Sequence, residues 1–117
     1  VLSGDDFVTY PMLAVGAVGV ISVTANVAPA DVTEMCEAHF SGDAERARSL
    51  HYKLRPLNRA MFIETNPIPA KTTLALMGKI GGEFRSPLCP PSEANLAKIR
   101  QAAEAYGLLP ARAGVSG

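Results

Sequence analysis

The stretch VGVISVT, residues 18–24, decides how this chain is expected to fold. Its β-branched and apolar side chains fall on both alternations of an extended backbone, whereas a half-exposed strand would alternate apolar with polar residues. Strands that are buried on both faces belong to parallel sheets covered by helices. The stretch therefore predicts a buried parallel strand in an α/β fold.

A short strand and a helix are expected before this stretch. Residues 1–2 are typical of a strand end, and Asp5 or Asp6 is expected to cap a helix over residues 7–15. Gly16 lies just past that helix, where glycine commonly ends one.

A second helix is expected after the stretch, because Pro29 suits a first helical turn and Gly42 can end the helix. Residues 1–42 therefore predict the order strand, helix, strand, helix. The apolar face of the second helix is expected to comprise Val32, Met35, Cys36 and Phe40.

The remaining residues, 43–117, are expected to be helical. Asp43 can cap a long helix that ends near Met61. NPIP, residues 66–69, is expected to end that run and open another helix, which Gly81 and Gly82 would stop.

A last helix is expected after Ser92, a capping residue, with Gly107 beyond its end. The tail ARAGVSG, residues 111–117, has nothing to bury and is expected to fray. The residues expected to face inward on this helix are Leu96, Ile99, Ala103 and Tyr106.

Two parallel strands cannot form a sheet that buries both faces, because each needs neighbours and covering helices. We therefore expect the chain to be the last part of a larger α/β protein, with the preceding strands supplied by a part that is missing here.

Composition excludes several classes of partner. The 11 basic and 11 acidic residues balance, which gives no electrostatic reason to expect nucleic acid or an anionic membrane. The apolar run over residues 15–23 is too short to span a bilayer. Cys36 and Cys89 make no disulfide framework and lack metal-ligand spacing, so we expect a cytoplasmic protein with neither metal nor cofactor.

Polar residues follow each predicted strand. Gly4, Asp5 and Asp6 lie at the carboxyl end of the first, where α/β proteins bind ligands, although a tight turn and a helix cap would explain them as well. From spacing alone the capping role is favoured. Thr24 and Asn26 end the second strand and either face a ligand or bond to nearby backbone.

The prolines of NPIP predict a rigid bend, for which a structural role is favoured. Lys71 is the one lysine considered for chemistry, although a solvated lysine in a first helical turn is the simpler interpretation. His39 and His51 fall on helices and fit no catalytic triad.

Three motifs together resemble one family. SGDD (residues 3–6), GxxGVISVTANVAP (16–29) and NPIPxK (66–71) resemble the carboxyl-terminal part of the dihydrodipicolinate synthases, also called 4-hydroxy-tetrahydrodipicolinate synthases. The resemblance runs from Val1 to about Leu109. It implies a (β/α)8 TIM barrel, with residues 1–42 as its last two βα units and residues 43–117 as appended helices.

The resemblance also implies a lyase that condenses pyruvate with aspartate semialdehyde in the diaminopimelate route to lysine. Pyruvate would form a Schiff base with a lysine upstream of this chain, so no catalytic residue is expected here and the chain alone should be inactive. Gly4, Asp5 and Asp6 would line the active-site mouth near the second substrate. The backbone carbonyl of Ile21 would face the Schiff-base lysine, and the full-length enzyme would be a homotetramer.

The chain departs from the family pattern at Thr65, where proline is usual, and at Thr72 and Thr73, where an aromatic residue or alanine is more common. Two alternatives stay open. One is a related pyruvate-dependent aldolase of the N-acetylneuraminate lyase or keto-sugar-acid type, and the other is a non-catalytic fragment that acts in assembly.

Overall fold

The expected parallel pairing of two extended segments is present, but it is short. In the computed structural model, which describes residues 1–110, Ser3 and Val20 form a single parallel bridge. The Ser3 N–H donates to the carbonyl of Gly19 at 2.9 Å, and the Ile21 N–H donates to the carbonyl of Ser3 at 2.8 Å. No longer strand occurs within residues 1–110, and most of these residues lie in helices.

The prediction that residues 18–24 are buried on both faces is wrong for the described chain. Val18 is 64% exposed and Ile21 is 71% exposed. The reason is that no third extended segment flanks the bridge within residues 1–110, so its outer edges stay unpaired and side chains of both alternations are exposed.

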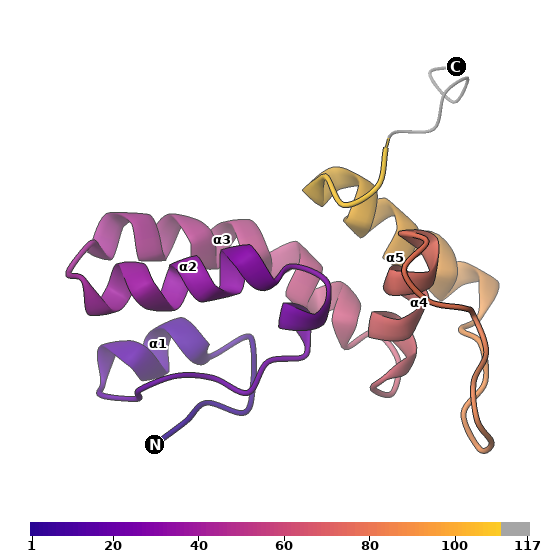
Figure 1. Ribbon diagram of the computed structural model, residues 1–117, viewed down its shortest axis with the longest axis horizontal. Helices are drawn as coiled ribbons and strands as arrows, with labels where there is room; N and C mark the ends of the chain where they lie inside the picture. The colour runs from indigo at the N-terminus through magenta and orange to yellow at the C-terminus, as the bar shows by residue number, and fades with distance from the viewer. Residues whose placement is uncertain (111–117) are drawn as a thin grey trace.

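The helices form two groups joined by one long helix, α3 (Figure 1). α2 and α3 lie side by side with α1 against them, while α4 and α5 lie toward the other end of α3. The elements are α1 (Thr9–Ala14), the 3-10 helix η1 (Thr24–Asn26), α2 (Pro29–Phe40), α3 (Ala44–Met61), α4 (Ile68–Leu76) and α5 (Glu93–Tyr106).

The predicted bounds of α2 and α3 are confirmed. Pro29 lies in the first turn of α2, and the Asp43 carboxylate caps α3 by accepting the N–H of Arg46 at 3.0 Å. The expected apolar face of α2 is only partly right. Val32 is buried, but Phe40 is 56% exposed at the end of the helix.

The expected caps of α1 are wrong. α1 begins at Thr9, and no side chain caps it. Both carboxylates that were expected to do so are engaged elsewhere: Asp5 accepts from the N–H of Phe7, and Asp6 accepts from the second extended segment. Gly16 does follow the helix, with a φ of 112° that favours glycine.

The end of α4 was also mispredicted. The helix ends at Leu76, and Gly78, with a φ of 76°, follows it, so the stop comes before Gly81 and Gly82. α5 agrees with prediction, since the Ser92 hydroxyl accepts the N–H of Asn95 at 3.2 Å.

Gly107 adopts the left-handed conformation just beyond α5, with a φ of 96°. Ile99 and Ala103, both expected to face inward on this helix, are fully buried. The tail that was expected to fray, residues 111–117, lies outside the described residues.

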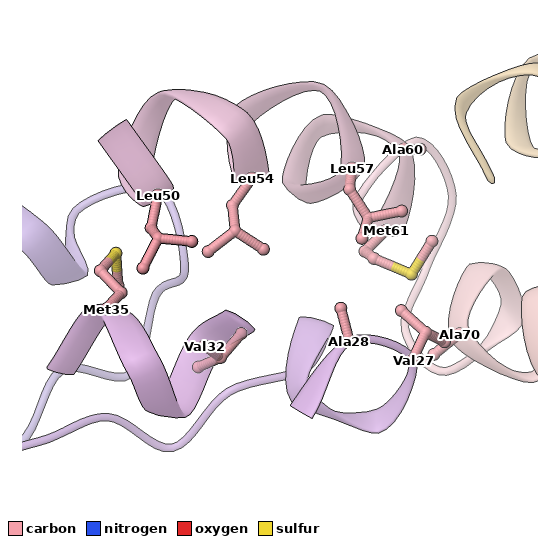
Figure 2. Close-up of a cluster of buried hydrophobic side chains, with 10 residues drawn as sticks. All are labelled: Val27, Ala28, Val32, Met35, Leu50, Leu54, Leu57, Ala60, Met61 and Ala70. Carbon is pink, nitrogen blue, oxygen red and sulfur yellow. The ribbon is translucent and has the colours of Figure 1, made fainter. Parts of the chain in front are cut away.

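The hydrophobic core lies between α3 and the segments below it (Figure 2). Side chains of α3 point toward α2 and toward the residues that follow η1. This packing holds the first 42 residues against the later helices. The buried cluster comprises Val27, Ala28, Val32, Met35, Leu50, Leu54, Leu57, Ala60, Met61 and Ala70.

No helix within residues 1–110 combines the length and the apolar character needed to cross a membrane.

Candidate functional site

Asp6 anchors the turn that follows the second extended segment. Its side chain is buried, and its carboxylate accepts the N–H groups of Val23 at 2.9 Å and Thr24 at 3.2 Å. The hydroxyl of Ser22 donates to the same carboxylate. Asp6 therefore accepts the N–H groups of Val23, which precedes η1, and of Thr24, its first residue, 17 and 18 residues along the chain.

Ser3 organises the turn around Gly4 and Asp5, a role that the sequence reasoning missed. Ser3 is fully buried; its hydroxyl donates to the carbonyl of Asp5 at 2.9 Å and accepts the Asp5 N–H at 3.2 Å. The hydroxyl of Thr9 also reaches the Asp5 carbonyl at 2.9 Å. A small polar residue at a strand end, directly before a glycine, was the available signal.

Asp5 is exposed, and its side chain bonds only to nearby backbone in the described chain. Its carboxylate accepts the N–H of Phe7 at 2.9 Å, two residues along the chain. This is the backbone bonding that aspartate commonly makes in turns. Asp5 and Asp6 therefore differ in environment although they are neighbours in sequence.

An open pocket of about 370 Å³ lies where the two extended segments end. It brings together Gly4 and Ile21 from the first part of the chain and the NPIP segment and α4 from the second. Neither Asp5 nor Asp6 lines it. The lining residues are Gly4, Ile21, Ser22, Val23, Asn26, Asn66, Pro67, Ala70, Lys71 and Leu74.

Gly4 and Ile21 both line this pocket. A Cβ atom added at Gly4 would meet nothing within 4 Å, so the space beside it is free in the described chain. The Ile21 N–H is used in the parallel bridge, while no group within residues 1–110 donates to its carbonyl oxygen. That oxygen is available as an acceptor for a group outside this segment.

The sequence did not decide whether Thr24 and Asn26 face a ligand or bond to nearby backbone, and the two side chains lie in different environments. Thr24 is buried, and its hydroxyl donates to the side-chain oxygen of Asn58 at 2.6 Å. Asn26 is exposed at the pocket, and its amide donates to the carbonyl of Val23 at 2.9 Å. Thr24 therefore acts in the core, and Asn26 combines a loop hydrogen bond with a place on the pocket wall.

Lys71 lies in the first part of α4, as expected, but it is held in place. Its ammonium donates to the carbonyl of Glu83 at 2.8 Å and lies 5.0 Å from the centre of the Phe84 ring. All four lysines are at least partly exposed, so none occupies the apolar, desolvated environment that activates a Schiff-base lysine. The other three are Lys53, Lys79 and Lys98.

The remaining titratable groups form no second centre in the described part of the chain. No cluster of three His, Cys, Asp or Glu side chains that could hold a metal ion occurs within residues 1–110. Cys36 and Cys89 are both free thiols, and burial raises the pKa of the Cys36 thiol. His51 stacks on Tyr10 at 5.1 Å, and burial lowers its pKa.

The comparisons with known proteins agree with the motifs around this pocket. The model of the dihydrodipicolinate synthetase family matches residues 1–106. The chain belongs to the dihydrodipicolinate synthetase family. Similar curated proteins include the 4-hydroxy-tetrahydrodipicolinate synthases of Thermodesulfovibrio yellowstonii, 58% identical over 93% of this chain, and of Nitratidesulfovibrio vulgaris strain DP4, 57% identical over 93%.

A solved structure of this family is similar along most of the chain. The dihydrodipicolinate synthase of Thermotoga maritima is 49% identical, with a TM-score of 0.90 over 92% of this chain. The chain spans only 37% of that structure, and 37–38% of the two curated relatives. The family resemblance drawn from the three motifs is therefore confirmed, and it concerns about a third of a family member's length.

Proposed function

We propose that this chain forms the last two βα units and the appended helices of a 4-hydroxy-tetrahydrodipicolinate synthase. Residues 1–42 would close the TIM barrel, and residues 43–117 would form the region beyond it. The whole enzyme would condense pyruvate with aspartate semialdehyde in the cytoplasm, on the diaminopimelate route to lysine.

The pocket beside the parallel bridge is the observation that carries this proposal. It lies at the carboxyl ends of two parallel-paired segments, which is where barrel enzymes place their active sites. Its wall combines Gly4 and Ile21 with Asn66 of the NPIP segment. Residues of all three family motifs thus meet at one place.

The chemistry would be divided between this chain and the part of its relatives that it does not match. A lysine outside this chain would condense with the ketone of pyruvate, losing water to form the Schiff base. Loss of a methyl proton gives an enamine, whose carbon attacks the aldehyde of the second substrate. Gly4 would line the pocket near that substrate, with Asp5 beside it at the mouth. The Ile21 carbonyl would face the lysine, and Asp6 would hold the Ile21–Asn26 turn in place.

A fusion protein tests the proposal. In this fusion, residues 1–117 replace the matching segment of the Nitratidesulfovibrio vulgaris synthase. It is incubated with pyruvate, reduced with borohydride and mapped by peptide mass. We expect one pyruvyl adduct, on a lysine outside residues 1–117, and consumption of aspartate semialdehyde. An adduct on Lys53, Lys71, Lys79 or Lys98 would overturn the placement of this chain within the barrel.

Substrate profiling of the same fusion separates the related aldolases. Cleavage of N-acetylneuraminate or of a keto-sugar acid, without turnover of aspartate semialdehyde, would reassign the substrate and keep the Schiff base. The homotetramer is a further expectation, which size-exclusion chromatography of the fusion tests.

A non-catalytic assembly role is the second candidate, because apolar side chains stay exposed at the bridge. Val1 is 88% exposed, Val18 64% and Ile21 71%. Under our proposal these side chains pack against the rest of the barrel. The fusion should therefore be soluble, whereas the isolated chain should self-associate in size-exclusion chromatography.

A further inference from the structure

Three buried polar residues form a closed ring of hydrogen bonds beside the pocket. The Asp6 carboxylate accepts the N–H of Thr24 at 3.2 Å, and the Thr24 hydroxyl donates to the side-chain oxygen of Asn58 at 2.6 Å. The amide of Asn58 closes the ring by donating to the backbone carbonyl of Asp6, at a longer 3.4 Å. All three residues are at most 5% exposed, and none of them lines the pocket.

This ring supports two residues that do line the pocket. Besides the N–H of Thr24, the Asp6 carboxylate accepts the hydroxyl of Ser22 and, at 2.9 Å, the N–H of Val23. Ser22 and Val23 both lie on the pocket wall. The backbone of residues 22–24 is therefore held by a group that is itself outside the pocket.

Ile21 lies between two fixed points of the backbone. Its N–H donates to the carbonyl of Ser3 at 2.8 Å, and the two residues after it are bound to Asp6. The peptide unit is planar, so few rotations remain between these two anchors. The anchors therefore fix the direction of the Ile21 carbonyl, which no group within residues 1–110 uses as an acceptor.

Asn58 brings α3 into this arrangement. It belongs to the appended helices, whereas its two partners in the ring, Asp6 and Thr24, belong to the first 42 residues. Its neighbours on α3 include Leu57 and Met61, both fully buried. An amide among apolar side chains costs stability unless it is hydrogen-bonded, and a satisfied buried network makes its surroundings rigid.

We propose that Asn58 and Thr24 are positioning residues for the Schiff-base step, so that α3 supports the active site as well as the fold. Through Asp6 they fix the backbone of residues 22–24, and so the direction in which Ile21 presents its carbonyl to the Schiff-base lysine. This inference rests on the proposed function, in which that lysine lies outside this chain. The carbonyl orients the amine for attack on the ketone of pyruvate and favours the protonated form of the lysine.

The test uses the same fusion protein and a matched pair of threonine variants. Thr24→Val and Asn58→Leu each remove the hydrogen bond between the turn and α3. Thr73→Val is the control, because it removes a fully buried hydroxyl that bonds to the carbonyl of Pro69, outside the ring. The initial rate of pyruvate adduct formation, trapped with borohydride, is measured from about pH 6 to about pH 10, around the range in which a perturbed lysine titrates.

We expect Thr24→Val and Asn58→Leu to slow adduct formation about tenfold each, since misplacing a reacting group by about 1 Å can cost on the order of a hundredfold. The pH midpoint of the rate should fall, because the lysine loses an acceptor that favours its protonated form. The double variant should be no slower than either single variant, because all three break the same contact. Thr73→Val should lower Tm and leave the rate and its pH midpoint unchanged.

Two results would overturn the inference and leave the proposed function standing. One is that Thr24→Val and Thr73→Val do not differ in rate or in pH midpoint. The other is a loss of rate by the same factor at every pH, because a smaller folded fraction lowers the rate without moving the midpoint. If Asn58→Leu melts below the assay temperature, the two threonine variants decide. A parent fusion that traps no pyruvate would instead refute the proposed function, and this inference with it.

Discussion

The Thr24 hydroxyl donates a 2.6 Å hydrogen bond to the side-chain oxygen of Asn58, and both residues are buried. The amide of Asn58 donates on its other side to the carbonyl of Asp6, at a longer 3.4 Å. One side chain of α3 thus contacts both turns that border the pocket. These contacts tie the first 42 residues to the helices that follow.

Replacing Asn58 by leucine should therefore destabilise the protein. The substitution leaves the Thr24 hydroxyl buried without an acceptor, at a cost of about 2 kcal/mol, or on the order of 5 °C in Tm. Thermal melting of the fusion measures the change. The double variant Asn58→Leu with Thr24→Val should lose less stability than the two single variants lose together. The reason is that each single change leaves the other side chain buried without its hydrogen-bond partner. Strict additivity would mean that the hydrogen bond contributes nothing.

Asp6→Ala should destabilise the protein more than the same change at the adjacent Asp5. It removes the acceptor for two N–H groups and one hydroxyl, and we expect a loss of about 3 kcal/mol. Asp5→Ala is the matched control: its one N–H partner, on Phe7, is exposed and can bond to water, so the expected loss is below about 1 kcal/mol. Equal losses in Tm at the two positions would contradict the anchoring role of Asp6.

A buried hydroxyl on α4 offers a stabilising change. Thr72 is 7% exposed, and within residues 1–110 its Oγ1 atom has no hydrogen-bond partner. Thr72→Val keeps the shape and removes the unsatisfied group, so we expect a gain of about 1 kcal/mol.

The neighbouring Thr73 is the control for this prediction. Its hydroxyl donates to the carbonyl of Pro69 at 2.9 Å. Thr73→Val should therefore lose stability by about 1 kcal/mol in the same melting experiment. If both valine variants shift Tm in the same direction, hydrogen bonding does not explain the difference between the two threonines.

A pH-dependent contribution is expected from Asp31, at the start of α2. Hydrogen bonds from Tyr106 and then Lys53 hold the pKa of this carboxyl below its usual value near 3.8. Burial, and then the hydrogen bond to Asp31, raises the pKa of Tyr106. Because the folded pKa is depressed, the stabilisation is present above the unfolded pKa and is lost as pH falls through the folded pKa.

The Tm difference between the parent and Asp31→Asn should therefore be largest near neutral pH and should shrink below about pH 4. Tyr106→Phe removes the largest cause of the shift and should narrow the pH range over which the difference disappears. A Tm difference that is constant from pH 7 to about pH 3 would refute the linkage.

Elements that depend on neighbouring residues could be predicted from the sequence. The caps at Asp43 and Ser92 bond to backbone three residues away, and the glycine after α5 needs only its own φ, so local chemistry determines them. The three motifs determined the family for the same reason, since each is a short run of residues.

Only the tertiary structure decided what the polar residues of those motifs do. Either Asp5 or Asp6 was expected to cap the first helix, but the Asp6 carboxylate accepts the N–H of Thr24. The Thr24 hydroxyl, for which a ligand or nearby backbone was expected as partner, donates to Asn58. These partners lie 18 and 34 residues apart, and the hydrogen-bonding capacity of a side chain does not specify which distant partner will satisfy it. Burial behaves in the same way: the pattern of residues 18–24 predicts an apolar strand, but neighbouring strands and helices decide whether it is covered.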